Sequence, residues 1–279
     1  FAGVLTGFIV LLGWIPLKQK PFLGTILNIL TIGNVLDLTM YFIPTPESII
    51  MRHGYLYFGT VLFAMGVGIY IGSGLGPGRT RDGINLFYPS DFNGMQKAGA
   101  LASQILDQVG EHVYPGQTTV ALDKFIQNQV DAASAISATI GYKGYQHASC
   151  ISINHVVCHG IPSEKRLKDG DILNIDVTVI VDGWYGDTSR MYVAGKPSRK
   201  AERLMDVTHE SLMRAIAVVK PGNTFGDIGH AIQSYVEAER MSVVRDFCGH
   251  GLGRVFHAPP NVLHYGRAGT GPVLEEGMF

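Results

Sequence analysis

Charged residues are so scarce in the first 82 residues that the two parts of this chain must fold in different surroundings. That stretch holds only five Lys or Arg and three Asp or Glu, although the whole chain has 22 and 23. Within it, residues 1–17, 22–43 and 54–75 form apolar runs. Each run has about the length that a tilted helix needs to cross roughly 30 Å of hydrocarbon. We therefore predict a membrane segment at residues 1–82 with about three transmembrane helices.

The basic residues predict which side of a membrane the rest of the chain would occupy. Lys18 and Lys20 follow the first apolar run, Arg79 and Arg81 follow the third, and Arg52 lies between the second and the third. Because positively charged loops tend to stay in the cytoplasm, everything after residue 82 is expected there. The three cysteines of the chain are too few for a disulfide framework, which also favours a reducing compartment. The whole chain would be membrane-anchored if residues 1–82 are a genuine part of the protein.

The function of residues 1–82 and their origin both remain open. Asn28, Asn34 and Asp37 could mark a polar pathway, and the chain would then be a multi-span membrane transporter with a non-catalytic, peptide-binding appendage. The stretch GSGLGPGRTRDG, which begins at Gly72, makes the segment resemble a poorly characterised family of multi-span bacterial membrane proteins, as far as about residue 84. A natural fusion and an accidental joining of two sequences both explain such an arrangement.

After a junction at residues 83–92, the sequence has the pattern of a soluble domain. Apolar residues recur at helical spacing from Phe92 to Val109, after Ser90 and Asp91 as candidate caps. A second helix, capped by Thr118 or Thr119, is expected to end near Ala133, and a strand-rich stretch follows. We predict an α+β domain over residues 93–279. The net charge of −1 without a basic block gives no reason to expect direct recognition of nucleic acid.

Residues 171–193 (DILNIDVTVIVDGWYGDTSRMYV) predict a hairpin whose turn is the Asp-Gly dipeptide at 182–183. That turn places Asp176 opposite Ser189, and alternation then puts Asp176 and Asp187 on one face of the hairpin. Their Cα atoms would lie about 7 to 8 Å apart. Two bare carboxylates there would repel each other, although hydrogen bonding alone would explain the pair if no further ligand existed.

A histidine between two glycines supplies a third candidate ligand. In the stretch FCGHGLGRVFHAPPNVLHY, His250 lies between Gly249 and Gly251, which let other backbone approach closely. Two carboxylates and an imidazole suit a divalent ion such as Mn, Fe, Co or Zn, and two such ions can share carboxylates and a water. The spacing of Cys150 and Cys158 does not match a zinc knuckle or ribbon, and no Gly-x-Ser-x-Gly elbow is present. These patterns favour metal-assisted hydrolysis.

Four motifs make residues from about 88 to 279 resemble type I methionine aminopeptidases. They are CHGIP at 158–162, NIDVTV at 174–179, GDTS at 186–189 and the histidine-containing stretch at 247–265. The resemblance implies a pita-bread fold, two divalent metal ions (Co, Mn, Fe or Zn) and removal of the initiator methionine from nascent chains whose second residue is small. It also implies nascent peptide N-termini as partners, the ribosome as a candidate partner, and a cytoplasmic catalytic domain.

Carried over position by position, the resemblance implies roles for individual residues. Asp176, Asp187 and His250 would be metal ligands, with Asp187 contacting both ions. His159 and His257 would be the catalytic residues that also bind substrate: His159 near the amine, and His257 at the scissile amide, where it helps to stabilise the tetrahedral intermediate. The methionine pocket would be lined by Tyr142, Tyr145, Cys150 and Phe256.

The resemblance also implies parts that the printed chain does not contain. Two glutamate ligands are expected beyond Phe279, the first of which would also act as the acid/base, so we expect the domain to be C-terminally incomplete. The printed chain could then be inactive, or act as a peptide-binding domain without catalysis. An Xaa-Pro aminopeptidase or a creatinase-like enzyme is the nearest alternative in the same fold, but residues 83–92 leave no room for the large N-terminal domain of those enzymes.

Overall fold

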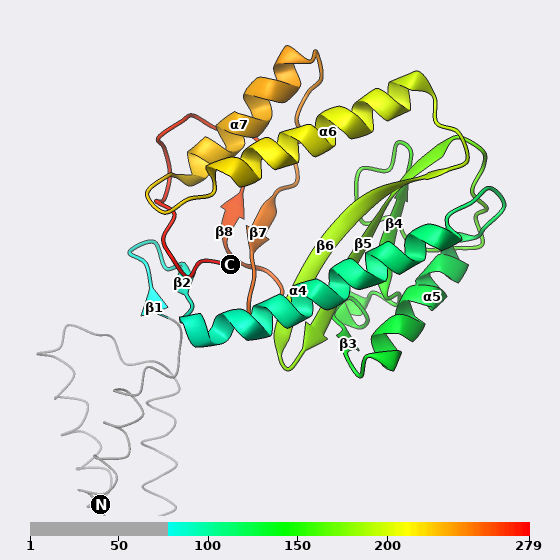
Figure 1. Cartoon of the computed structure of the whole chain (residues 1–279), viewed down its shortest axis with the longest axis horizontal. Coiled ribbons are helices and arrows are strands. Elements are labelled where there is room, and N and C mark those ends of the chain that lie inside the picture. Colours follow the sequence, from blue (N-terminus) through cyan, green and yellow to red (C-terminus); the bar gives the residue numbers. More distant parts are fainter. Residues whose placement is uncertain (1–77) are drawn as a thin grey trace, which may run out of the picture. The chain divides into compact units, whose positions relative to one another are not determined.

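The computed structural model describes residues 78–279, which lie within one compact unit formed by Gly76–Phe279. The predicted transmembrane runs at 1–17, 22–43 and 54–75 fall outside the described residues. Between residues 78 and 279, no helix combines the length and the apolar character needed to cross a bilayer. The described part of the chain is the α+β part, and Figure 1 shows its arrangement.

Helix α4 (Pro89–Val109) follows a small hairpin of β1 (Gly78–Arg79) and β2 (Asn85–Leu86). The helix begins before Phe92, so Ser90 and Asp91 lie inside its first turn and neither is the N-cap residue, although the Asp91 side chain takes part in the capping. Tyr88 is the N-cap residue, and its backbone N–H donates to the Asp91 carboxylate at 3.0 Å. Pro89 fits the first helical position because its fixed φ suits the helix and no N–H is needed there.

Helix α5 (Thr119–Ala132) begins at the predicted place. The Thr118 side chain caps it by accepting a hydrogen bond from the backbone N–H of Ala121 at 3.3 Å. Two short 3-10 helices, η1 (Gly110–His112) and η2 (Tyr142–Gly144), lie in the connections before and after α5.

A four-stranded antiparallel sheet forms the centre of the unit. Its strands are β3 (Ile136–Ser137), β4 (Ser149–Ile153), β5 (Asp171–Val181) and β6 (Trp184–Ala194). Strand β5 pairs along its whole length with β6, and with β4 and β3 over successive stretches. The predicted hairpin register is confirmed, since Asp176 faces Ser189 and both turn residues, Asp182 and Gly183, have the positive φ that this tight turn requires.

Helices α4 and α5 cover one face of this sheet (Figure 1). The inward residues of β5 are fully buried against them: Leu173, Ile175, Val177 and Val179. Burial of each such side chain stabilises the fold by about 1.5–3 kcal/mol, so a one-residue slip of the register would be costly. The even-numbered residues of β5, Asp176 among them, are thereby directed to the opposite face.

The remaining elements form a second layer of helices and a ribbon. Helices α6 (Arg199–Val218) and α7 (Phe225–Ala238) pack side by side and share a core with Leu274 (Figure 1). Strands β7 (Gly249–Gly251) and β8 (Ala258–Val262) form a two-stranded antiparallel ribbon. The ribbon carries His250, which lies far along the chain from the central hairpin.

Candidate metal and peptide site

The acidic pair lies on the face of the central hairpin away from α4 and α5. In the register of β5 and β6, Thr178 is opposite Asp187, and its hydroxyl donates to Asp187 Oδ1 at 3.1 Å. Asp176 lies two residues before Thr178 on the same face. The register therefore places the two carboxyl groups on one face, as predicted, and Asp187 raises the pKa of Asp176 through its charge and a hydrogen bond.

The proximity of Asp187 changes the protonation of Asp176. Burial is the largest cause that raises the pKa of Asp176 to about 7, and the charge of Asp187 and the hydrogen bond with it act in the same direction. The charge of His250 opposes these effects. Without a cation, the pair therefore holds a proton near neutral pH, which is the expected behaviour of two carboxylates that cannot both ionise cheaply.

His250 approaches the pair from β7. Its Nε2 lies 3.4 Å from Asp187 Oδ2, while its Nδ1 donates to the carbonyl oxygen of Gly251 at 2.9 Å. The hydrogen bond with Asp187 is the first cause of a raised His250 pKa. Because a carbonyl only accepts, Nδ1 carries a proton and Nε2 is the nitrogen presented to the carboxylates. This is how metal-binding imidazoles are commonly held.

Glycines permit the close contacts that place these ligands. A Cβ at Gly251 would lie 2.3 Å from the carbonyl oxygen of Pro259 on β8, so the ribbon requires glycine beside His250. A Cβ at Gly249 would make ordinary contacts with Val262, at 3.4 Å from its Cβ and 3.6 Å from its carbonyl oxygen. The expectation of close backbone approach is therefore met on one side of His250. Gly186 plays the same part beside Asp187, because a Cβ there would lie 2.2 Å from the Ala98 carbonyl oxygen of α4.

Aromatic rings surround His257 at the edge of this cluster. Its Nδ1 is 3.0 Å from the Tyr142 hydroxyl, and its ring centroid is 4.4 Å from that of His250 and 4.2 Å from that of Phe256. Burial is the main cause that lowers the pKa of His257, followed by the charge of His250. The ring is therefore kept neutral near physiological pH.

The four expected pocket residues form two contacting pairs, Tyr145 with Cys150 and Tyr142 with Phe256. The backbone N–H of Tyr145 donates to the Tyr142 carbonyl oxygen at 3.0 Å and joins the pairs into one aromatic and thiol wall. Cys150 pairs with Asp176 across β4 and β5, and its thiol interacts with the Tyr145 hydroxyl. Burial raises the pKa of Cys150, so its thiol stays protonated and uncharged. Tyr142 packs on Phe256 with ring centroids 4.9 Å apart.

His159 has a looser connection to the cluster. Its ring packs edge-on against Phe247, with centroids 5.7 Å apart, and its backbone has a positive φ of 55°. After burial and His250, His159 is one of the smaller influences that lower the His257 pKa. It therefore lies near His257. Within the described residues 78–279, its side chain makes no hydrogen bond to another predicted site residue.

Sequence reasoning missed one aromatic residue of the wall. Tyr185 stacks on Phe256 with centroids 5.7 Å apart. It lies two residues before Asp187 on β6, so alternation along the strand was a sufficient signal. The contact of Phe247 with His159 had no such signal, because it joins two irregular segments.

The three predicted ligands fit a divalent cation in their chemistry. Within residues 78–279, no group of three or more His, Cys, Asp or Glu side chains is placed so that it could hold an ion as it stands. Burial and the charge of Asp187 nevertheless raise the pKa of Asp176, a cation would relieve both effects, and the Nε2 of His250 lies 3.4 Å from Asp187 Oδ2. The donor set is therefore suitable but needs rearrangement or further donors to complete a coordination shell.

Comparison with known proteins relates each part of the chain to a family. Residues 93–279 match Metallopeptidase family M24, and residues 2–86 match a family of unknown function (DUF6198). The methionine aminopeptidase of Rickettsia prowazekii is 55% identical over 196 residues, which are 70% of this chain and 76% of the relative. That of Escherichia coli K12 is 52% identical over 197 residues, which are 70% of this chain and 75% of the relative.

Solved structures agree with these matches. The crystal structure of the Rickettsia prowazekii enzyme has a TM-score of 0.69 at 54% identity, and the match covers 70% of this chain and 79% of that one. The methionine aminopeptidase of Thermotoga maritima has the same TM-score and the same coverage at 38% identity. Prolidase from Pyrococcus furiosus, at 21% identity and a TM-score of 0.60, shares the fold alone. Residues from about 80 to 279 thus have the expected pita-bread fold, and the chain belongs to metallopeptidase family M24, in which it is similar to the type I methionine aminopeptidases.

Proposed function

We propose that this chain removes the N-terminal methionine from polypeptides by metal-assisted peptide hydrolysis. The observation that carries the proposal is the convergence of two carboxyl groups and one imidazole beside a wall of aromatic rings and a neutral thiol. The identity of about half to methionine aminopeptidases over 70% of the chain supports the reaction and the substrate class.

Asp176, Asp187 and His250 would hold two divalent ions of the Co, Mn, Fe or Zn kind. Such ions act as Lewis acids and lower the pKa of water, which supplies a nucleophile at neutral pH. Asp187 is suited to serve both ions, because it contacts Asp176 on one side and His250 on the other. The hydrogen bond from Thr178 fixes the rotamer of the Asp187 carboxylate.

His257 would stabilise the charge that develops on the scissile amide. Its lowered pKa keeps the ring neutral, so one nitrogen carries a proton and the other does not. If the Tyr142 hydroxyl donates to Nδ1, the proton of His257 is on Nε2, where it can donate to a developing oxyanion. His159 would contact the substrate near its amine, and Phe247 supports its ring.

The pocket wall is suited to a methionine side chain. It offers aromatic edges and an uncharged thiol, which come from Tyr142, Tyr145, Cys150 and Phe256. Thioethers make favourable contacts with aromatic rings.

The proposed substrates are nascent peptide N-termini, which the enzyme would bind in the cytoplasm and near the ribosome. Residues 1–82 would tether the enzyme to a membrane, and fractionation of cells into membrane and soluble parts tests that tether.

A peptide assay tests the proposed activity. The chain is measured as printed and also extended past Phe279 with the C-terminal segment of the Rickettsia prowazekii relative. We expect the extended chain to release methionine from Met-Ala-Ser with Mn or Co and to stop when a chelator is added. A Gly-Pro peptide is the control for the prolidase alternative. Absence of cleavage with every metal, in a folded extended chain, would contradict the proposal.

A further inference from the structure

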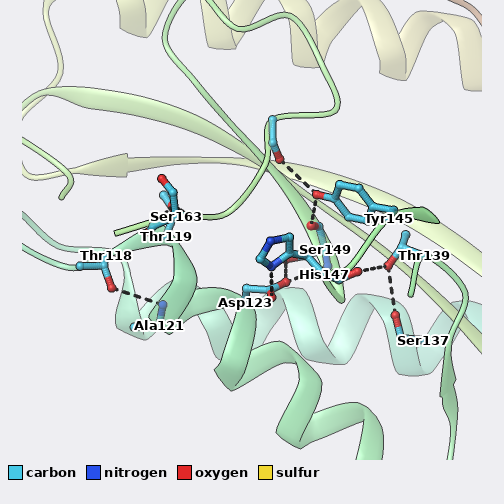
Figure 2. Close-up of polar contacts among 11 residues, drawn as sticks. Thr118, Thr119, Ala121, Asp123, Ser137, Thr139, Tyr145, His147, Ser149 and Ser163 are labelled. Atoms are coloured by element: carbon cyan, nitrogen blue, oxygen red, sulfur yellow. Dashed lines mark hydrogen bonds and ion pairs between the residues drawn. The ribbon is translucent and has the colours of Figure 1, made fainter. Parts of the chain in front are cut away.

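Asp123 is a buried acid that the proposed mechanism does not use. It lies on α5, on the side of the sheet away from the metal ligands, and is 6% exposed. Figure 2 shows it at the centre of a polar network that joins α5, the start of β4 and the loop before it. A buried carboxylate is costly unless donors surround it, so the network demands an explanation.

Three donors converge on the Asp123 carboxylate. Its Oδ1 accepts from the backbone N–H of Ser149 at 2.9 Å and from the Ser149 hydroxyl at 2.7 Å. Its Oδ2 lies 3.0 Å from His147 Nδ1, which must donate because a carboxylate only accepts. Ser149 is completely buried, so these bonds are shielded from water and hold the strand firmly.

Ser149 transmits this hold to the pocket wall. Its carbonyl oxygen accepts a hydrogen bond from the Tyr145 hydroxyl at 2.9 Å, which fixes the Tyr145 ring (Figure 2). The next residue, Cys150, points to the other face of β4 and is opposite Asp176. Asp123 therefore holds β4 from the α5 side of the sheet, at the point where the opposite side would contact the substrate.

His147 transmits the hold to the loop that carries Tyr142. The carbonyl oxygen of His147 accepts from the Thr139 hydroxyl at 2.7 Å, which closes the base of the loop (Figure 2). Within the loop, the N–H of Gly141 donates to the carbonyl oxygen of Tyr145 at 2.7 Å. Tyr142 and Tyr145 are thus both connected to a single carboxylate.

We propose that Asp123 is a positioning residue that sets the shape of the methionine pocket through Ser149, Tyr145 and the Tyr142 loop. This inference rests on the proposed function and adds to it the residue behind the pocket wall. An apolar side chain could fill the same volume at less cost, but it would leave Ser149 and His147 without their acceptor. A wall held by directed hydrogen bonds keeps one geometry, which recognition of one side chain requires.

The test compares three variants of the extended chain described above. Asp123→Ala removes all three bonds, whereas Asp123→Asn keeps an acceptor oxygen for Ser149 and can donate to the other tautomer of His147. Asp131→Asn is the matched control, because Asp131 is an exposed acid on the same helix whose side chain accepts a hydrogen bond from the exposed Gln127 amide at 2.7 Å. Measurements are KM and kcat for Met-Ala-Ser, the Kd for L-methionine, and the Kd for Mn.

For Asp123→Ala we expect KM and the Kd for L-methionine to rise about 5- to 30-fold, with kcat and the Kd for Mn changed less than about 3-fold. Asp123→Asn should recover most of the loss, and Asp131→Asn should behave as the unsubstituted chain. If Asp123→Ala does not fold, Ser149→Ala, which removes one bond, should show a smaller loss in the same direction.

Other outcomes would overturn the inference. One is activity that falls only with the folded fraction while KM stays unchanged, and another is a KM increase that Asp131→Asn shares. If the unsubstituted chain neither cleaves the peptide nor binds methionine, the proposed function fails and this inference fails with it. If the unsubstituted chain does both and Asp123→Ala matches it, only the positioning role fails.

Discussion

The charge of Asp176 is unfavourable in the folded chain until a cation is bound. Its raised pKa means that the ionised form is less stable in the fold than in the unfolded chain. Asp176→Asn should therefore weaken Mn binding at least about tenfold and raise the stability of the metal-free chain by roughly 1–2 kcal/mol near pH 8. Calorimetric titration and thermal unfolding measure the two effects. Asp131→Asn should cause neither effect. If Asp176→Asn made the metal-free chain less stable than the unsubstituted chain, the charge of Asp176 would not be unfavourable in the fold.

Protons should compete with the metal at the same residue. Because the folded pKa of Asp176 is about 7 and its ordinary value is 3.8, metal-free stability should decline as pH rises between these values. Mn must displace the proton below about pH 7, so its apparent affinity should be about tenfold lower near pH 6 than near pH 8. Titrations at both pH values measure this. An affinity independent of pH would show that the retained proton is not on the metal site.

Tyr142 should influence catalysis through His257. Tyr142→Phe removes the hydroxyl that lies 3.0 Å from Nδ1 but keeps the ring that packs on Phe256. We expect kcat to fall about tenfold with KM changed less than threefold, because the tautomer of His257 is no longer fixed. Steady-state kinetics on Met-Ala-Ser measure the two constants. An increase in KM alone would make Tyr142 a pocket residue only.

At the scale of elements, the contact of α4 with β6 places Asp187. A Cβ at Gly186 would lie 2.2 Å from the backbone oxygen of Ala98, and backbone atoms of a helix cannot move aside cheaply. Gly186→Ala should destabilise the chain by about 2–4 kcal/mol and weaken Mn binding, since Asp187 is adjacent. Gly99→Ala, one residue along the same helix and in open space, is the control and should stabilise by about 0.5–1 kcal/mol. Equal effects on thermal unfolding at both sites would contradict this account.

The hairpin of β5 and β6 could be predicted from sequence because its determinants are local. The turn dipeptide fixes the register, and strict alternation fixes the face of every residue, so the position of Asp176 beside Asp187 followed from spacing alone. The start of α4 was placed too late because Ser90 and Asp91 were read as caps, although Pro89 suits the first turn.

At the scale of the whole molecule, contacts between segments far apart in the chain could not be predicted from the spacing of residues. The approach of His250 to Asp187 depends on the ribbon of β7 and β8. In the sequence, only its flanking glycines and the resemblance to a family indicate that His250 is a ligand. The hold of Asp123 on Ser149 likewise joins a helix to a strand, and no local pattern indicates it. Tyr185 is different, since alternation along β6 could have identified it.

The position of a bound divalent ion is the most direct test of Asp176, Asp187 and His250 as metal ligands. Crystals of the chain soaked with Mn and measured at a wavelength where Mn scatters anomalously would locate it directly. We expect anomalous density within about 2.0–2.5 Å of carboxylate oxygens of Asp176 and Asp187 and of His250 Nε2. Anomalous density at a different place would contradict the assignment of these three residues as the metal ligands. So would anomalous density that keeps its position and height in Asp187→Ala.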